Sequence, residues 1–409
     1  MQTRPGSVQP AMSRTRSSRR VESALPVVRL LAEWMAIPSV NPAFLPPGDL
    51  RAGEGRMVAS VVDHARRAGL DVECQVAAPD RCNVVVRLRP PGRIRYRILL
   101  APHLDTVGEP NLDAQLRPRM EGGRLHGRGA CDTKGSAAAM FQALLDVAET
   151  GTRPRETELV FVGLVDEENF QLGSRHYAAL ARKRGKAAAY RADLAIVGEP
   201  TRLEVVSAHK GDVWLQLRTR GVAAHGATPH LGRNAVTDMA RVVLALEGDY
   251  SRQLGLRRPH PLLGRPTVNV GSIQGGTQPN IVPAVCEISI DRRFIPGETP
   301  ESVDREIRAV LRQAGVKAEF VDLRGSPCAA LETDPELPLV RQFLAAAGRK
   351  RTRGVHYFCD AAPLAAAGIP AIVFGPGDIA QAHTTGEWIA VDQLERARGI
   401  LVKFLRSQP

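Results

Sequence analysis

Short runs in which consecutive side chains are all apolar constrain the fold of this chain most. The clearest runs are residues 83–88, 98–101, 159–165, 192–197 and 371–374. A strand with one face in water alternates apolar and polar residues, whereas a strand covered on both faces is apolar at successive positions. Segments with helical apolar spacing, such as 136–149 and 173–184, separate several of these runs. The pattern predicts an α/β fold with a mostly parallel sheet sandwiched by helices.

A central part of the chain has a different pattern. Residues 213–219 alternate apolar and polar side chains, and residues 285–290 do so approximately. Apolar stripes predict helices over residues 235–246 and 300–314. Two helices with several half-exposed strands indicate a small α+β module.

This module interrupts the first domain, because residues 337–346 and 371–374 return to the earlier pattern. We therefore expect four segments along the chain. They are a basic tail (1–20), the first part of the main domain (21–210), the inserted module (211–323) and the second part of the main domain (324–409).

Charge and composition narrow the functional classes. The net charge is +12, but residues 1–20 alone carry five arginines and no acid. Aromatic residues make up 4 % of the chain and are not interleaved with basic runs, so we expect no specific nucleic-acid binding. No apolar run approaches the ~18 residues that a membrane span needs.

The cysteines and the start of the sequence bear on the cellular compartment. Six cysteines are scattered without a C-x-x-C pair, at positions 74, 82, 131, 286, 328 and 359. In a chain of this length they are predicted to be reduced, mostly buried thiols. The N-terminal segment is basic but lacks the apolar core of a secretory signal, so we expect a cytoplasmic protein.

Polar side chains that follow the apolar runs are candidate site residues, because ligands collect beyond the carboxyl ends of parallel strands. These residues, together with an acid from the glycine-rich loop 127–135, are His103, Asp105, Asp132, Glu167, Glu168, Glu199 and His383. Carboxylates packed closely raise one another's pKa values, and a bound cation removes that cost. Mixed imidazole and carboxylate ligands suit zinc or cobalt.

Seven ordered motifs then make a family resemblance visible. They are APHLDTV (101–107), GRGACDTKG (127–135), VDEE (165–168), VGEPT (197–201), AAHGATPHLGRNA (223–235), NIVPAVCEISIDRRFIPGE (280–298) and AHTTGEW (382–388). From about residue 27 onward, the sequence resembles the dizinc amidohydrolase family of acetylornithine deacetylase, succinyl-diaminopimelate desuccinylase, aminoacylase and carboxypeptidase G. The resemblance implies a catalytic main domain and a ferredoxin-like inserted domain that serves as a lid and for dimerisation.

The resemblance also implies a set of metal ligands. Asp132 would bridge two divalent ions, with zinc as the first choice and cobalt as the alternative. His103 and Glu199 would hold one ion. Glu168 and His383 would hold the other, and a cis peptide bond would follow Asp132. Three carboxylates and one bridging hydroxide would balance the charge of the two ions.

Catalytic roles follow from the same resemblance. Asp105 would bind the far nitrogen of His103 and fix its tautomer. Glu167 would act as general base, taking a proton from the metal-bridging water and passing it to the leaving amine. His225 would reach across a dimer to the active site of the partner subunit and donate to the tetrahedral oxyanion.

Two further residues match family positions that bind the substrate carboxylate. They are Asn280 and Arg293, and the planar guanidinium of Arg293 suits bidentate pairing with a carboxylate. A surface ion pair with Asp291 is the alternative role of Arg293.

The resemblance implies a metal-dependent hydrolase of amino-acid metabolism that acts as a homodimer through the inserted domain. Its substrate would be a small N-acyl amino acid of the acetylornithine or succinyl-diaminopimelate kind. A dipeptidase or carboxypeptidase is the first alternative, and a catalytically silent binding protein on the same fold is the second. The sequence does not separate acetyl from succinyl substrates.

Overall fold

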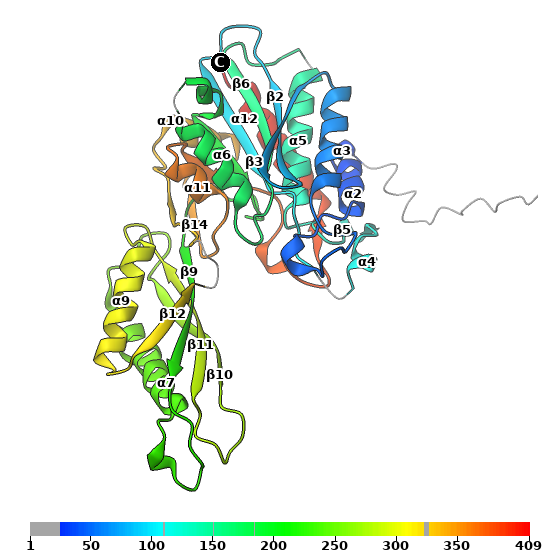
Figure 1. Cartoon of the computed structure of the whole chain (residues 1–409). Helices are drawn as coiled ribbons and strands as arrows, with labels where there is room; N and C mark the ends of the chain where they lie inside the picture. The colour runs from blue at the N-terminus through cyan, green and yellow to red at the C-terminus, as the bar shows by residue number, and fades with distance from the viewer. Residues whose placement is uncertain (1–24, 109–110, 150, 184, 323–326) are drawn as a thin grey trace, which may run out of the picture.

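The computed structural model describes residues 25–108, 111–149, 151–183, 185–322 and 327–409. Within them the chain forms a main domain and a smaller body that extends from it (Figure 1). The expected basic tail, residues 1–20, lies outside the described residues. None of the helices in the described part combines the length and the apolar composition that a bilayer span requires.

A nine-stranded sheet forms the centre of the main domain. Across the sheet the strands are β1 (Asp71–Ala78), β2 (Arg81–Leu88), β6 (Thr157–Gly163), β3 (Tyr96–Pro102), β7 (Leu194–Gly198), β15 (Ala371–Val373), β8 (Val206–His209) and β13 (Leu331–Glu332), with β14 (Arg353–Val355) paired to β8. The inner strands β6, β3, β7 and β15 run parallel to one another, whereas β1 and β2 are antiparallel additions at one edge. The expected mostly parallel sheet is confirmed.

Helices cover both faces of this sheet, as Figure 1 shows. One face carries α2 (Pro26–Ala36), α3 (Gly55–Arg67), α5 (Lys134–Glu149), α10 (Pro338–Ala346) and α12 (Val391–Arg406), and the other carries α6 (Leu172–Arg182) and α11 (Ala361–Ala366). In β3, Ile98 and Leu100 pack into the first hydrophobic core while Leu99 packs into the second. Burial on both faces is why successive residues of this strand are apolar.

The smaller body is a four-stranded antiparallel sheet with helices on one face. Its strand order is β10 (Thr267–Gly275), β11 (Val285–Phe294), β9 (Gly211–Arg220) and β12 (Ala318–Asp322). The helices α7 (Ala235–Leu244) and α9 (Pro300–Gln313) supply its core, and α7 continues through a π-helical turn (Ala245–Tyr250) into α8 (Ser251–Leu256). Strand, helix, two strands, helix and strand in this order give the ferredoxin-like topology that the resemblance implied.

Short elements complete the two domains. They are η1 (Pro42–Phe44), α4 (Leu112–Gln115), η2 (Gly185–Tyr190), η3 (Pro229–Leu231, in the smaller body), η5 (Ile379–Gln381) and a small sheet of β16 (Trp388–Ala390), β5 (Arg124–His126) and β4 (Arg119–Glu121). The small sheet joins the loop that precedes α5 to the segment that precedes α12, so these two distant parts of the chain lie side by side.

The prediction that all six cysteines are reduced is wrong for two of them. Cys74 and Cys82 form a disulfide between β1 and β2. The antiparallel register places Cys74 opposite Val84 and Cys82 opposite Val76, so the two Cα atoms come within 5.8 Å of each other. A search for C-x-x-C pairs does not detect a pair that a hairpin brings together. Cys131, Cys286, Cys328 and Cys359 are buried and form no disulfide, as expected.

Candidate metal centre

Two groups of potential metal ligands meet at the carboxyl edge of the parallel strands. His103 follows β3, Glu168 follows β6, Glu199 follows β7, and Asp132 precedes α5. The ligand atoms of His103, Asp132 and Glu199 lie within 4.8 Å of one another, and so do those of Asp132, Glu168 and His383. The structure thus brings together all five residues for which a metal-binding role was expected.

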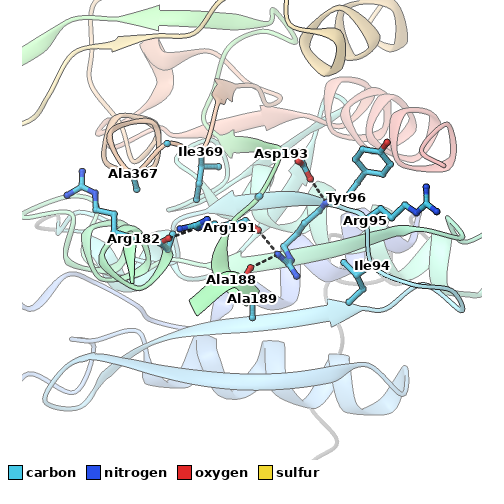
Figure 2. Close-up of a pocket in the computed structure, with 14 residues that line it drawn as sticks. Ile94, Arg95, Tyr96, Arg182, Ala188, Ala189, Arg191, Asp193, Ala367 and Ile369 are labelled. Carbon is cyan, nitrogen blue, oxygen red and sulfur yellow. Dashed lines mark hydrogen bonds between the residues drawn. The ribbon is translucent and has the colours of Figure 1, made fainter. Parts of the chain in front are cut away.

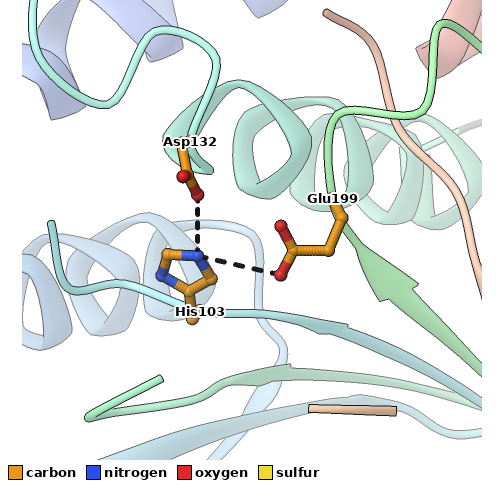
Figure 3. Close-up of side chains that lie close together, drawn as sticks. All are labelled: His103, Asp132 and Glu199. Carbon is orange, nitrogen blue, oxygen red and sulfur yellow. Dashed lines mark hydrogen bonds and ion pairs between the residues drawn. The ribbon is translucent and has the colours of Figure 1, made fainter. Parts of the chain in front are cut away.

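Asp132 belongs to both groups and faces a different imidazole with each oxygen. His103 Nε2 lies 3.1 Å from Asp132 Oδ1 and 3.9 Å from Glu199 Oε1 (Figure 3). His383 Nε2 lies 3.2 Å from Asp132 Oδ2 and 3.1 Å from Glu168 Oε2. Two imidazoles and three carboxylates with one shared acid form a donor set suited to two borderline divalent ions.

Burial and charge at this site also fit bound cations. Glu199 Oε1 is buried and has no hydrogen-bond partner among the described residues. A buried carboxylate oxygen without a partner is costly unless a cation or a proton compensates it. Burial also raises the pKa of Glu199 well above its ordinary value, and it raises the pKa of Glu168 to about 7.

The two imidazoles and Asp132 are shifted toward their charged forms, unlike Glu168 and Glu199. Hydrogen bonds to Asp132 and Glu168 raise the pKa of His383 to about 10. Burial favours the neutral form of Asp132, but bonds with His103 and His383 outweigh it and hold its pKa below the ordinary range. The carboxylates therefore attract positive charge, which protons supply here and metal ions can supply instead.

Glu167 lies beside the ligands but belongs to neither group. Its side chain is buried, and burial raises its pKa well above the ordinary value, with further contributions from Glu199 and Glu168. The Glu167 carboxyl group lines the same cavity as Asp132 and Glu199. This position leaves a carboxylate free to exchange a proton with a molecule in the cavity.

Asp105 holds the surrounding backbone more than it holds the imidazole. His103 Nδ1 lies 3.0 Å from the backbone oxygen of Asp105 and 3.4 Å from its carboxylate. The two carboxylate oxygens accept hydrogen bonds from the backbone N–H groups of Glu167 and Glu168, both at 3.1 Å, and from the Asn41 side chain. Asp105 thus fixes the directions in which the strand-end acids leave the backbone.

Glu387 is a residue of the centre that the sequence analysis missed. Its buried carboxylate accepts hydrogen bonds from the backbone N–H groups of Gly129, Cys131 and Asp132 at 2.8–3.0 Å, and it pairs with Arg128 at 2.8 Å. The peptide bond after Asp132 is cis, as the resemblance implied. An acid inside the same motif as His383 is the signal that could have drawn attention to Glu387.

The expected substrate-binding residues of the smaller body do not all lie at the centre. Arg293 lines the cavity of the metal ligands, and it also forms the anticipated ion pair with Asp291 at 2.9 Å. Asn280 and His225 are exposed and lie next to each other, since Gly226 N–H donates to the Asn280 carbonyl at 2.7 Å. Neither of them lines the cavity.

The cavity at the centre has a volume of about 520 Å³ and contains Asp132, Glu167, Glu168, Glu199 and His383 in its wall. A larger cavity of about 840 Å³ lies at the opposite ends of the strands, where β3 and β7 begin (Figure 2). Its wall holds four arginines but no histidine or cysteine, and Arg97 is paired with Glu158. The chemistry of the side chains therefore assigns the smaller cavity as the candidate active site.

The doubly covered sheet, the ferredoxin-like body and the two ligand groups that share Asp132 define a metal-dependent hydrolase. Comparison with known families agrees. Residues 207–319 match the peptidase dimerisation domain of M20 proteins, and residues 83–239 match the model of peptidase family M28. The chain is 30 % identical to acetylornithine deacetylase of Vibrio cholerae over 371 residues, which cover 88 % of this chain and 93 % of that protein. The chain belongs to the M20 family of metal-dependent peptidases and deacylases.

Solved structures share the fold. An M20 family metallo-carboxypeptidase from Sulfolobus solfataricus superposes with a TM-score of 0.75 at 17 % identity, covering 94 % of this chain and 99 % of that chain. A Bacillus subtilis protein described as a dinuclear metal binding peptidase of the M20 family superposes with a TM-score of 0.66 at 12 % identity, covering 93 % of this chain and 96 % of that chain.

Proposed function

We propose that this protein hydrolyses the amide bond of a small N-acyl amino acid of the acetylornithine or succinyl-diaminopimelate kind. The observation that carries the proposal is the single cavity in which Glu167 lies beside two ligand groups and Arg293 lies in the same wall. An amide, a water molecule and a substrate carboxylate each find a suitable partner there. The similarity to acetylornithine deacetylases supports this substrate class.

The residues divide into metal ligands and groups that act on the substrate. His103, Asp132 and Glu199 would hold one divalent ion, and Asp132, Glu168 and His383 a second. When bound, such ions, zinc as the first choice and cobalt as the second, polarise a carbonyl and lower the pKa of water.

Glu167 is the proposed general base. Its carboxylate would accept a proton from the attacking water and deliver that proton to the amine that leaves. Because its neighbour Glu168 contributes to a ligand group while Glu167 does not, the two adjacent acids have separate tasks. The Asp105 carboxylate holds both residues in place by accepting hydrogen bonds from the backbone N–H groups of Glu167 and Glu168.

Arg293 is the proposed partner of the substrate carboxylate. Its guanidinium already lies near Asp291 and, at 3.6 Å, near Asp212, which hold it at the cavity. A bidentate pair with a substrate carboxylate would orient the amide toward Glu167.

We further propose that the chain forms a homodimer through its inserted domain, residues 211–323. Along the chain this domain separates the two parts of the catalytic domain, residues 21–210 and 324–409. His225 and Asn280 of one subunit would then complete the site of the other, with His225 donating to the oxyanion and Asn280 binding the substrate carboxylate. The match to the M20 dimerisation domain and the exposure of both side chains support this arrangement.

The proposed location is the cytoplasm, and neither nucleic acid nor a membrane is a proposed partner. The Cys74–Cys82 disulfide is unusual for a reducing compartment. Alkylation of thiols in intact cells, followed by mass spectrometry, tests the location, since a fully oxidised pair in the cell would contradict it.

The decisive experiment is a substrate panel with the zinc- or cobalt-loaded full chain. We expect hydrolysis of N-acetyl and N-succinyl amino acids, loss of activity after chelation, and recovery when metal is restored. Chelation should also lower the melting temperature, because an ion that binds only the folded state stabilises it.

Other outcomes of the same panel identify the alternatives. Cleavage of dipeptides without cleavage of any N-acyl amino acid would replace the proposal by a dipeptidase or carboxypeptidase. A metal-loaded protein that cleaves nothing in the panel would favour the silent binding protein.

A further inference from the structure

Aromatic side chains are concentrated in the wall of the candidate active site. Phe, Trp and Tyr together make up 4 % of the chain. Five of the fourteen residues that line this cavity are nevertheless aromatic, and two more are aliphatic. These seven residues are Phe44, Phe170, Trp214, Tyr357, Phe358, Val107 and Ile379.

Several of these side chains are exposed rather than part of a core. Phe44, Phe170 and Trp214 are 41 %, 38 % and 37 % exposed, and Ile379 is 40 % exposed. They come from separate segments of both domains, so no single packing requirement of one element explains them. Exposed apolar surface gathered inside a cavity is typical of a binding site for an apolar group.

Among the described residues, the same wall has no spare carboxylate that could pair with a cationic side chain. Its four acids are Asp132, Glu167, Glu168 and Glu199, and all belong to the ligand groups or to the proposed general base. The described lining contains no further carboxylate. The ammonium group of an ornithine or diaminopimelate side chain would therefore have no free acidic partner in this wall.

The position of Arg293 indicates which part of the substrate meets the rings. Its guanidinium carbon lies 5.6 Å from the centre of the Phe358 ring. On the neighbouring strand, Trp214 lies opposite Asp291, the residue that pairs with Arg293. An amino acid carries its carboxylate and its side chain on the same carbon, so a carboxylate at Arg293 places the side chain beside these rings.

We infer that the preferred substrate is an N-acyl amino acid with an aromatic or branched aliphatic side chain, in place of a cationic one. Phe170, Trp214 and Phe358 would contact that side chain while Arg293 pairs with the carboxylate. This inference rests on the proposed hydrolysis of N-acyl amino acids, and within that substrate class it replaces the cationic side chain of the acetylornithine kind by an apolar one.

The kinetic test compares substrates that share one acyl group. We expect kcat/KM of the zinc-loaded enzyme for N-acetyl-phenylalanine and N-acetyl-leucine to exceed that for N-acetylornithine by at least about tenfold, the order that apolar pocket contacts provide. A kcat/KM for N-acetylornithine that equals or exceeds the other two would overturn the inference.

A binding test separates this inference from the proposed reaction. Calorimetry on metal-loaded Glu167→Gln protein would use the same three ligands, and the apolar ligands should bind about tenfold more tightly. If the apolar ligands bind more tightly but the wild-type enzyme hydrolyses no N-acyl amino acid, the proposed function ends and only the preference of the cavity for an apolar ligand remains. If the wild type hydrolyses these compounds but the three ligands bind equally well, the proposed function stands and the inferred preference for an apolar side chain is overturned.

Variants test the contribution of the rings. Phe170→Ala and Trp214→Ala should each lower the ratio of kcat/KM for N-acetyl-phenylalanine to that for N-acetylglycine by about tenfold. Tyr96→Ala is the matched control, because Tyr96 is 42 % exposed and lines the other cavity. A ratio that stays at the wild-type value in the folded Phe170 and Trp214 variants would refute the role of the rings.

Discussion

Two adjacent acids at the end of β6 differ in what surrounds them. Glu168 lies 3.1 Å from His383, whereas Glu167 belongs to neither ligand group. The same residue, Asp105, accepts hydrogen bonds from both backbones, so we expect a change in the Glu167 side chain to leave the position of Glu168 unaltered. The site therefore permits a clean test of the general base.

Glu167→Gln should retain two metal ions per chain and lose turnover by a factor of about 10²–10⁴, the usual contribution of a general base. The amide has nearly the shape of the carboxylate but does not accept the proton. Elemental analysis and steady-state kinetics check the two halves of this expectation. A rate within threefold of the wild type, with metal content unchanged, would remove Glu167 from this role.

His209 is a buried histidine outside the catalytic cavity. Its Nδ1 lies 2.9 Å from the Lys210 carbonyl oxygen, and Nε2 has no hydrogen-bond partner within the described part of the chain. Burial lowers the pKa of His209 from 6.5 to about 4. The unfolded chain therefore binds a proton more readily than the folded chain between these two pH values.

The stability that neutral His209 contributes should be complete above about pH 6.5 and lost as the pH falls through about 4. The difference corresponds to about 3 kcal/mol of unfolding free energy. Denaturant titrations of wild type and His209→Gln across this window isolate the effect, because the other groups titrate alike in both proteins. We expect the wild type to lose about 3 kcal/mol more than the variant, and parallel profiles would contradict the assignment.

For single residues, the sequence indicated the candidate ligands better than the residues that hold them in position. The candidate ligands and Glu167 could be picked out because parallel strands end along one edge and the chain carries acids and imidazoles just after these strands. Glu387 escaped because its partners are mainly backbone N–H groups, which no residue pattern displays. Asp105 was expected to act on His103, but its shortest contact to that ring comes from its backbone oxygen.

Among the elements, strands with long apolar runs were predicted well and short polar ones were not. The inner strands β3, β6 and β7 could be predicted from their hydrophobicity alone, because both of their faces are covered. Short strands such as β13 and β14 form by pairing with β8, and two or three residues are too few to show a strand pattern in the sequence. Of the antiparallel pair β1 and β2, only β2 was predicted, and the disulfide between the two strands was missed.

The Cys74–Cys82 bond should stabilise the β1–β2 pair at the sheet edge. Cross-linking residues separated by 8 positions restricts the unfolded chain, with an expected effect of about 2–3 kcal/mol. The double variant Cys74→Ser/Cys82→Ser should therefore unfold more easily by that amount in denaturant titrations.

A buried free thiol provides the comparison. Cys286→Ser changes a cysteine in β11 that forms no disulfide, so this variant keeps the Cys74–Cys82 bond and its stability should still fall when reductant is added. The double variant lacks the bond and should not respond to reductant. Reductant should lower the stability of the wild type toward that of the double variant. Identical curves for the oxidised wild type and the double variant would show that the bond adds nothing.

For the whole molecule, the inserted body presents different residues at its two ends. Arg293 lies opposite Asp212 at the start of β9 and reaches the cavity, whereas His225 follows the end of the same strand. The ten residues of β9 separate these ends by about 33 Å. Within one chain, His225 is thus far from the cavity that Arg293 lines.

Mixing inactive variants tests whether a partner subunit supplies His225. A dimer of His225→Ala and Glu167→Gln chains contains one site with Glu167 from the first chain and His225 from the second. Random exchange should restore about one quarter of the wild-type activity. Chains that carry both substitutions, mixed with His225→Ala, should restore none and serve as the control. No recovery after mass spectrometry has demonstrated exchange would exclude a shared site.

The wall of the cavity could not be predicted from the sequence because its residues come from nine separate segments of the chain and from both domains. Phe44 and Phe170 are isolated aromatic residues and Tyr357 and Phe358 are one adjacent pair, so they form no periodic pattern. Only the three-dimensional arrangement places them around one space, which is why the motifs predicted an N-acyl amino acid but left its acyl group and its amino acid open.

The late position of His383 and Glu387 determines when the protein becomes competent during synthesis. The strands β3, β6 and β7 emerge from the ribosome long before the segment that follows β15. Until Glu387 has emerged, the loop that carries Asp132 lacks the carboxylate that binds its N–H groups, and the second ligand group lacks its imidazole. A nascent chain can thus build most of its sheet without a complete hydrolytic centre, so we expect unfinished polypeptides to be inactive.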